Sequence, residues 1–446
     1  MGNNQLTGLI LSTPSGMRDI LPKETYIRDW VSDKILKVYQ KYNFERIETP
    51  ILENIQNLKR QDGGENLSLI FEVLKRGDKL DEVLKTQAFS KDDLIDYGLR
   101  FDLTVPLVRY FVNNQANLTN PFKSIQIGPV FRAERPQKGR FRQFTQCDID
   151  IIGVKNESCE IELIDATAKA LVAIGFKDFT VVINDRRLIT NLLKSLNLPD
   201  NEMAKVFIII DKIDKIGQSG MEAEIDASFD HSIAQKLKLT LDNLLQISQS
   251  NNTDVIKNFK DLKSILPGID LNEIENILGA MNKVINICKA LSSDLYNFKF
   301  DPTLARGMGY YTGMIFEIKA GGVNYSLAGG GRYDNMIGKI SNRPTPACGF
   351  SIGFERVVGL LLDQNLTENI TSSDKLALIY NSDKDDLASV INLMASFQNL
   401  GYNVSIMTRK KDITKQLNQL VENRFTKYCI YNKDNESNKI KDFFDR

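Results

Sequence analysis

The chain has 446 residues but only one histidine, His231. A Ser-His-Asp triad, a multi-histidine metal site and a paired-histidine acid–base site therefore cannot be built from it. His231 lies in the polar segment SFDHSIA, so we expect it to be an ordinary surface residue. Any catalysis must rest on arginine, carboxylate, amide and tyrosine side chains.

Cysteine, net charge and long apolar runs are also scarce. The five cysteines form no C-x-x-C pair, which predicts reduced thiols and not a disulfide framework or a zinc site. Lys+Arg and Asp+Glu both number 57, so the net charge of zero neither proposes nor excludes a polyanionic partner. No run has the length of a membrane span, and the first residues match neither a signal peptide nor the N-terminal acylation pattern. We expect a soluble, cytoplasmic protein without membrane association.

Hydrophobic periodicity predicts mixed helix and strand at both ends of the chain, with a mostly helical insertion over residues 178–295. Strands are expected at 44–52, 122–134, 140–153, 309–320 and 347–352. Residues 100–112 are expected to form a strand with a turn at Pro106 that runs into a helix, and AGGGRYD (328–334) a glycine-rich turn. The expected helices of this part are 23–42, 157–174 and the residues following 352. Residues 375–446 alternate as β-α-β-α-β, which predicts a small α/β domain with a parallel sheet.

The segment FRAERPQKGRFRQFTQCDID, residues 131–150, mixes opposite charges with phenylalanine. If 122–153 fold as a hairpin, period-two alternation places Arg132, Phe144, Gln146, Asp148 and Asp150 on one face. A solvated surface hairpin is the alternative interpretation, but a phenylalanine has no reason to lie on a wet charged face. A ring, a phosphate-binding arginine and amine-binding carboxylates together indicate a nucleotide beside an amino acid.

This segment resembles motif 2 of class II aminoacyl-tRNA synthetases, most closely that of the histidyl-tRNA synthetase family. Five further stretches resemble the same family in the same order: SGMRDILP (15–22), motif 1 in YNFERIETPILE (42–53), the two histidine motifs in ARGMGYYTGMIFE (305–317) and LAGGGRYDNM (327–336), and motif 3 in PACGFSIGFERV (346–357). The resemblance implies an α+β fold. Its catalytic domain, an antiparallel sheet flanked by helices, would comprise residues 1–177 and 296–365 around the insertion. Residues 375–446 would form a shortened anticodon-binding-like domain.

The resemblance also implies residue roles. ATP would be bound by Arg132, Glu134, Arg140, Phe144 and Arg356, and histidine by Asp102, Leu103, Thr104, Gln146, Asp150, Arg306, Tyr310 and Tyr311. Arg306 and Arg132 would be catalytic, because fixed guanidinium groups stabilise the charge that develops on the attacked α-phosphate. Taken alone, Arg356 would be interpreted as a surface arginine and the tyrosine pair as core packing. Gly309 departs from the usual R-G-L-D-Y-Y by removing a carboxylate.

The implied function is ligation of L-histidine to tRNA(His) through histidyl-adenylate, with ATP and Mg²⁺ as co-substrates, by a homodimer. The carboxylates that would hold Mg²⁺ cannot be assigned from the sequence. One alternative is a non-catalytic histidine-binding paralogue that regulates ATP phosphoribosyltransferase; such regulators typically lack the C-terminal domain and have eroded ATP motifs. A third is an interaction protein that binds tRNA-like partners and keeps the fold without needing the arginines. The presence of Arg132, Phe144, Arg306 and Arg356 favours the enzyme.

Overall fold

The computed structural model describes residues 10–60, 66–136, 140–249, 271–305, 310–323, 325–364, 375–433 and 438–443. The chain divides into two compact units, Met1–Gln364 and Asn365–Arg446, and each is described by itself. No helix in the described ranges combines the length and the apolar character that crossing a membrane requires.

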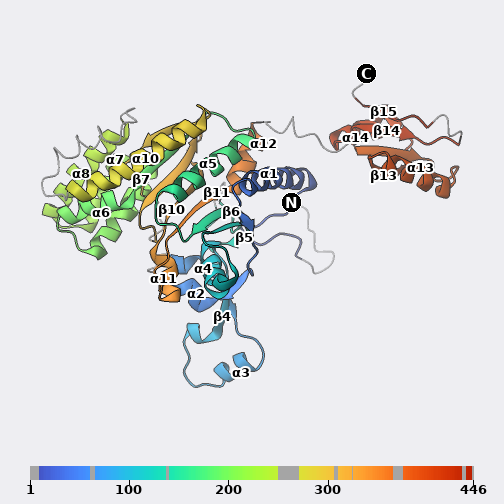
Figure 1. Cartoon of the computed structure of the whole chain (residues 1–446). Helices are drawn as coiled ribbons and strands as arrows, with labels where there is room; N and C mark the ends of the chain where they lie inside the picture. The colour runs from blue at the N-terminus through green and yellow to red at the C-terminus, as the bar shows by residue number, and fades with distance from the viewer. Residues whose placement is uncertain are drawn as a thin grey trace. The chain divides into compact units, whose positions relative to one another are not determined.

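An eight-stranded, mostly antiparallel sheet organises the first unit, in the order β1-β5-β6-β11-β10-β9-β7-β8 (Figure 1). Its strands are β1 (Glu45–Arg46), β5 (Phe122–Phe131), β6 (Gln143–Ile152), β7 (Phe179–Asp185), β8 (Asn297–Phe300), β9 (Met314–Ala320), β10 (Ser326–Arg332) and β11 (Ala347–Ile352). The predicted hairpin is confirmed: β5 and β6 are antiparallel, with Val130 opposite Phe144 and Gln126 opposite Asp148. Because paired residues share a face, Phe144, Gln146, Asp148 and Asp150 lie on one side of the sheet, called here the site face.

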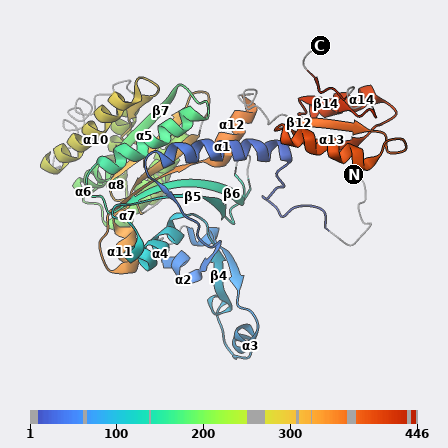
Figure 2. The ribbon, with the colours of Figure 1, turned by 45° about the vertical axis from the view of Figure 1, so that its right-hand side comes forward.

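A layer of helices covers the opposite face: α1 (Pro22–Gln40), α5 (Ser158–Ala173), α10 (Leu271–Ser292) and α12 (Phe354–Asp363) (Figure 2). Helix α1 begins at Pro22, whose fixed φ suits the first helical position, and buries Ile27, Val31 and Ile35 at helical spacing. This layer also holds a buried ion pair, in which Arg332 Nε and Nη2 donate to the Glu160 carboxylate at 2.6 and 2.8 Å. The helices predicted after Pro22, over 157–174 and after residue 352 are thus confirmed.

Smaller elements pack around the site face. They are α4 (Thr104–Asn114), α11 (Asn335–Ser341), and a three-stranded sheet of β2 (Leu52–Asn54), β4 (Ile95–Leu99) and β3 (Phe71–Leu74) with α2 (Ile55–Arg60) and α3 (Asp78–Leu84) (Figure 2). Their shared core contains Phe101, Val108 and Ile337 together with Phe122 and Ile152 at one end of the hairpin.

Three local predictions were wrong. The strand expected at 44–52 is split into β1 and β2, because Pro50 cannot donate to a ladder. Residues 100–103 are not strand, and Pro106 lies inside the first turn of α4, where its missing N–H costs nothing. AGGGRYD is no turn, since it contributes most of β10 in the middle of the sheet. A Cβ on Gly330 would lie 2.1 Å from Gly349 O, so glycine permits close approach of neighbouring strands.

Helices dominate the segment expected to be an insertion. They are α6 (Arg186–Ser195), α7 (Asp200–Ser228), α8 (His231–Gln249) and α10. The segment's first residues, however, form β7, which pairs antiparallel with β9 and parallel with β8 in the main sheet. Helix α7 is kinked at Gly217, whose φ of 66° is left-handed. The first of these helices, α6, therefore follows strand β7 directly and begins at Arg186.

The second unit is a small α/β domain with the predicted β-α-β-α-β order. It contains β12 (Lys375–Tyr380), α13 (Leu387–Asn399), β13 (Asn403–Thr408), α14 (Ile413–Glu422) and β14 (Lys427–Ile430), followed by the short β15 (Lys441–Asp442). Strand β12 is parallel to both β13 and β14, as expected, and β15 adds an antiparallel edge. Asp386 and Asp412 cap the two helices by accepting from the Ser389 and Lys415 amides at 2.9 Å.

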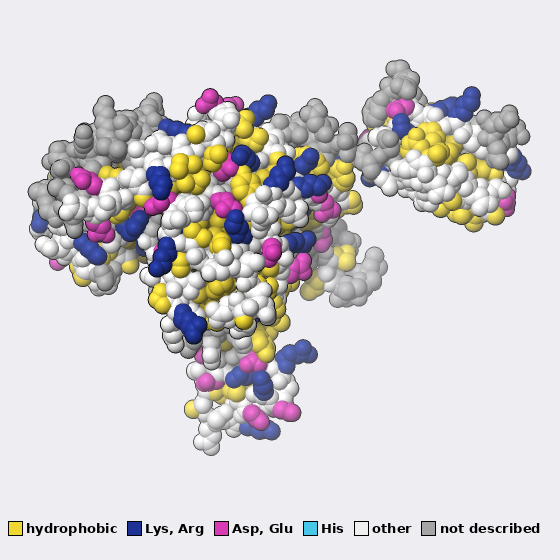
Figure 3. All heavy atoms as spheres, viewed as in Figure 1, with side chains coloured by type: hydrophobic (Ala, Val, Ile, Leu, Met, Phe, Trp, Pro, Cys, Tyr) yellow, Lys and Arg dark blue, Asp and Glu magenta, His cyan; other side chains and the backbone are white. Residues whose placement is uncertain are grey.

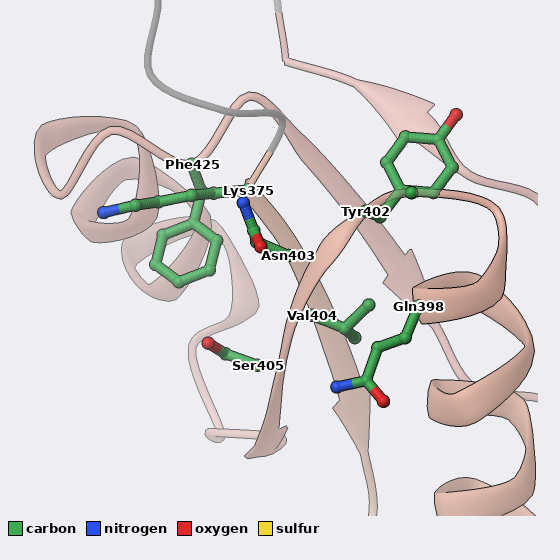
Figure 4. Close-up of a pocket in the computed structure, with 8 residues that line it drawn as sticks. Lys375, Gln398, Tyr402, Asn403, Val404, Ser405 and Phe425 are labelled. Carbon is green, nitrogen blue, oxygen red and sulfur yellow. The ribbon is translucent and has the colours of Figure 1, made fainter.

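A pocket of about 500 Å³ lies beside β13 in this unit (Figure 4). Its walls include the rings of Tyr402 and Phe425, the amides of Gln398 and Asn403, and Lys375. Tyr402 packs with the core cluster of Leu376 and Val390, and Phe425 with that of Ala377 and Leu417, so the two rings lie on opposite faces of the sheet (Figure 4).

Candidate active site

The floor of the site face is made of glycine where four strands meet. Asp150 on β6 is opposite Gly349 on β11, Gly349 is opposite Gly331 on β10, and Gly331 is opposite Ile315 on β9. The absence of side chains at 349 and 331 leaves room above the sheet for the Asp150 carboxylate and for Tyr311 and Tyr333. The glycines thus create space for functional side chains.

Arg132 and Phe144 stack on each other at one end of this face. The Arg132 guanidinium carbon lies 5.0 Å from the Phe144 ring centre, and its Nε donates to Phe101 O at 3.1 Å. Neither terminal nitrogen of Arg132 has an acceptor among the described residues. One edge of the guanidinium is thereby fixed, and the fork that can bind a phosphate bidentately is free. The two residues predicted for ATP therefore come together as a ready phosphate and base site.

Three carboxylates gather next to this stack. Asp102, Asp148 and Asp150 are all buried and interact electrostatically. Burial, followed by repulsion from Asp102, raises the pKa of Asp150 to about 7, although the hydrogen bond from Tyr333 opposes the shift. Burial and repulsion from Asp150 raise the pKa of Asp148 well above its usual range. Such a cluster attracts a cationic ligand, because an ammonium group would relieve the repulsion among the three groups.

Gln146 points to a missing ligand. Its side-chain oxygen is buried, yet it accepts no hydrogen bond from any described residue. Buried polar atoms are nearly always satisfied, so a donor from a bound molecule is the simplest partner. Gln126 holds the neighbouring segment in place, because its Nε2 donates to Leu103 O at 3.0 Å.

The segment that carries Asp102, Leu103 and Thr104 is itself well fixed. All three residues are buried, and Asp102 Oδ1 accepts from the Val105 amide at 3.1 Å at the start of α4. The Asp102 carboxylate thus lies at the positive end of a helix, beside the other two carboxylates.

The predicted tyrosines lie on the far side of the carboxylates. Tyr310 and Tyr311 have ring centres 4.7 Å apart, and Tyr310 meets Tyr333 edge to face at 6.0 Å. Tyr333 Oη in turn donates to Asp150 Oδ1 at 2.6 Å. The three rings form an aromatic wall that is connected to the carboxylate cluster through Tyr333, although Tyr311 also packs with the core residues Val182 and Ile315.

Glu134, Arg140 and Arg356 are less closely gathered. Arg140 lies 3.5 Å from the Glu134 carboxylate at the exposed hairpin end. Arg356, on α12, donates from Nη1 to Ser326 O at 2.8 Å and lies over the Tyr325 ring. The Arg356 side chain therefore lies at the start of β10. Phe144 lies at the same end of the sheet, because Ala328 of β10 pairs with Ile352, which in turn pairs with Cys147 of β6.

Arg306 and Gly309 lie outside the described residues. The convergence of Arg306 with Phe144 on one nucleotide therefore stays a prediction.

The structure also brings Tyr333 into the site. Alternation along the hairpin had already placed Asp148 on this face with Gln146 and Asp150, and the observed register confirms it. Tyr333 lies inside the second histidine motif, but no role was assigned to it. Tyr333 could not be found from its sequence, because its partner Asp150 is 183 positions away.

Cys159, Glu160 and Cys348 have ligand atoms close enough to hold a metal ion. The Arg332 guanidinium already occupies this cluster, donating to Cys159 Sγ at 2.8 Å as well as to Glu160. It also lies on the helix-covered face of the sheet. These residues therefore do not fit a Mg²⁺ ion that accompanies ATP.

Gly349→Ala is expected to weaken histidine binding at least tenfold. A Cβ at this position would lie 2.1 Å from Asp150 Oδ1 and 3.3 Å from Tyr333 Cε1, so the carboxylate must move and its bond to Tyr333 must break. Overpacking of this kind also costs about 1–3 kcal/mol of stability. Isothermal calorimetry with histidine and urea unfolding would measure the two effects. Gly359→Ala is the control, because nothing lies within 4 Å of its Cβ position; equal effects of both variants would contradict the prediction.

Comparisons with known proteins agree with this geometry. Residues 16–357 match the family model of histidyl-tRNA synthetase. The histidine--tRNA ligase of Leifsonia xyli is 40% identical over 95% of this chain and 96% of its own length, and that of Azobacteroides pseudotrichonymphae is 34% identical over 93% and 89%. The crystal structure of histidyl-tRNA synthetase from Nostoc superposes with a TM-score of 0.76 at 26% identity, covering 97% of this chain and 95% of that one. The chain therefore belongs to the histidyl-tRNA synthetase family.

Proposed function

We propose that the protein activates L-histidine with ATP and transfers the histidyl group to tRNA(His). One observation carries the proposal: the free fork of Arg132, stacked on Phe144, lies beside a buried carboxylate cluster and the unsatisfied Gln146 oxygen. A phosphate and base site adjoining an ammonium site is what formation of an aminoacyl-adenylate requires. Relatives named histidine--tRNA ligase at up to 40% identity support the same conclusion.

The site residues bind different parts of the two substrates. Phe144 stacks on adenine, with Glu134 at its amino group, while Arg132, Arg140 and Arg356 bind phosphate oxygens. Asp102 and Thr104 position the α-amino group, and Gln146 and Asp150 share the amino group and the imidazole with Tyr310 and Tyr311. A pocket that hydrogen-bonds both imidazole nitrogens rejects apolar analogues strongly, because its own buried groups would be left unpaired.

In the activation step the histidine carboxylate oxygen attacks the α-phosphorus and pyrophosphate leaves. Arg132 and Arg306 stabilise the negative charge that builds on the α-phosphate oxygens. Mg²⁺ accompanying ATP would neutralise the leaving pyrophosphate, held mainly by phosphate oxygens. The terminal ribose hydroxyl of tRNA then takes the acyl group and AMP leaves. Undiminished activation by an Arg306→Ala variant would remove that residue from the mechanism.

The regulatory paralogue is the second candidate considered. A structure described as an ATP phosphoribosyltransferase regulatory subunit/histidyl-tRNA synthetase, from Bacillus halodurans, superposes with a TM-score of 0.72 at 20% identity, which shows the fold alone. The phosphate-binding fork of Arg132, which has no acceptor among the described residues, favours the enzyme.

The remaining assignments concern domains and assembly. We propose that residues 1–177 and 296–365, together with β7, form the catalytic domain of a cytoplasmic homodimer, with the helices that begin at Arg186 inserted and 375–446 binding the anticodon. Equal charging of tRNA(His) transcripts with native and altered anticodons would contradict the C-terminal assignment. A monomer by light scattering at micromolar concentration would contradict the dimer.

Histidine-dependent exchange of pyrophosphate into ATP tests the central proposal. Purified protein should exchange label only when histidine is present, and then charge tRNA(His). Binding of histidine without exchange would instead support the regulatory paralogue. Failure to bind histidine at all would remove both candidates.

A further inference from the structure

Basic and acidic side chains of the described residues are interspersed on the face shown in Figure 3. A single arginine near the site stands out instead. Arg186 follows β7 and begins α6, and its backbone N–H donates to Gly313 O at 3.0 Å. Gly313 comes two residues after Tyr311 in the aromatic wall. Arg186 therefore lies at the rim of the predicted histidine site, on the side of the helical insertion.

The Arg186 side chain is stacked but not ion-paired. Its guanidinium carbon lies 3.9 Å from the centre of the Phe207 ring on α7. Among the described residues it has neither a carboxylate partner nor a hydrogen-bond acceptor, and burial alone lowers its pKa. The next residue behaves differently, because Arg187 Nε and Nη2 bind the Asp185 carboxylate at 2.9 and 2.7 Å. Of two consecutive arginines, one is paired within the protein and one is left open.

An open, half-buried guanidinium indicates an anionic ligand. Removing a charge from water without a partner is costly, and the stack on Phe207 offsets only part of that cost. The stack also fixes the plane of the guanidinium, so its donors present a rigid fork that suits a phosphate. Replacing Arg186 should therefore weaken ligand binding more than it lowers the stability of the fold.

The position of Arg186 in the sheet indicates which phosphate it would bind. Four strand spacings separate β6, which carries Phe144, from β7, which ends at Asp185. At about 4.8 Å each they amount to about 19 Å, too far for Arg186 to share the phosphates bound by Arg132. We propose that Arg186 binds a backbone phosphate of the tRNA 3′ strand, within the few nucleotides that precede the terminal nucleotide that accepts histidine. The proposal rests on the proposed function and adds a substrate-binding residue to it.

The test compares Arg186→Gln with the wild type for binding and charging of tRNA(His) transcripts. We expect kcat/KM for tRNA to fall about 10- to 100-fold, while histidine-dependent pyrophosphate exchange stays within twofold. The slope of log Kd for tRNA against log salt should decrease by about one. Lys205→Gln is the matched control, because it removes one exposed positive charge from the same helix as Phe207 and should change tRNA binding little.

A transcript without its last four nucleotides locates the contact. Truncation should weaken binding by the wild type more than binding by Arg186→Gln, since the variant has already lost one of the contacts to this segment. Equal losses in both proteins would overturn the proposal, as would reduced pyrophosphate exchange with a raised KM for ATP, which would assign Arg186 to the nucleotide. Absence of exchange in the wild type would count against the proposed function, whereas the binding comparison tests Arg186 independently.

Phe207→Leu separates stacking from a structural role. It keeps an apolar side chain on α7 but removes the ring that orients Arg186. An intermediate loss of tRNA affinity is expected, with a modest decrease of the unfolding midpoint, because Phe207 is buried and leucine fills less of its space. A lowered midpoint with unchanged tRNA affinity would show that the stack serves only the fold and would overturn the proposal.

Discussion

Replacing Arg132 by glutamine is expected to lower the rate of histidine-dependent pyrophosphate exchange by about 100- to 1000-fold. The guanidinium is held at Nε by Phe101 O and rests on the Phe144 ring, so its two terminal nitrogens are positioned before substrates arrive. A preorganised cation at the attacked phosphate stabilises the transition state more than the ground state, so kcat should fall as well as affinity for ATP.

Arg132→Lys should remain at least tenfold impaired, because an ammonium group keeps the charge but loses the planar fork. Arg46→Gln is the control: Arg46 pairs with Glu48 on the surface, and its loss should leave exchange unchanged. Single-turnover formation of adenylate would separate chemistry from binding. Full activity of Arg132→Lys would show that charge alone suffices and would contradict the geometric argument.

Asp150→Asn is expected to weaken histidine binding about 100- to 1000-fold. The carboxylate is buried, accepts from Tyr333 at 2.6 Å and lies directly above Gly349. Removing one partner of a buried charged interaction typically costs 2–5 kcal/mol. Because the pKa of Asp150 is raised to about 7, the wild type should also bind histidine more weakly as pH falls below 7. The variant should retain only the pH dependence that comes from the imidazole of histidine, whose pKa is about 6.5.

The same substitution should stabilise the protein above neutral pH. In the folded chain Asp150 keeps its proton up to about pH 7, whereas in the unfolded chain it releases the proton near pH 4. Between these values folding takes up a proton, so the contribution of Asp150 to stability falls as pH rises and is least favourable above pH 7. Asp150→Asn should therefore exceed the wild type by on the order of 2–4 kcal/mol at pH 8 and by little at pH 4.

Urea unfolding at both pH values would measure this difference. A destabilised variant at pH 8 would show that the carboxylate is held by favourable contacts, contrary to the repulsion among Asp102, Asp148 and Asp150. Ser351→Ala is a useful companion, because Ser351 donates to Asp148 on the same face and not to Asp150. It should lower stability without the gain at pH 8.

Much of the fold could be predicted from short sequence patterns. Helix α1, the β5–β6 hairpin and the alternating C-terminal unit follow from apolar spacing, Pro22 and period-two alternation, all of which act within a few residues. The segments that were misjudged depend on distant neighbours. Three successive glycines indicate a turn by themselves, and only the closeness of Gly349 and Met314 to them makes a central strand of β10.

The family, the order of the motifs and the residue types available for chemistry follow from the amino-acid sequence alone, because a single histidine leaves arginine, carboxylate, amide and tyrosine. Tertiary structure decided which of these groups meet. It placed Tyr333 on Asp150, kept the fork of Arg132 free, and paired Arg187 while leaving Arg186 open. The physical reason is that burial and charge repulsion act over a few ångströms in space between residues far apart in the chain, and no local pattern reports such distances.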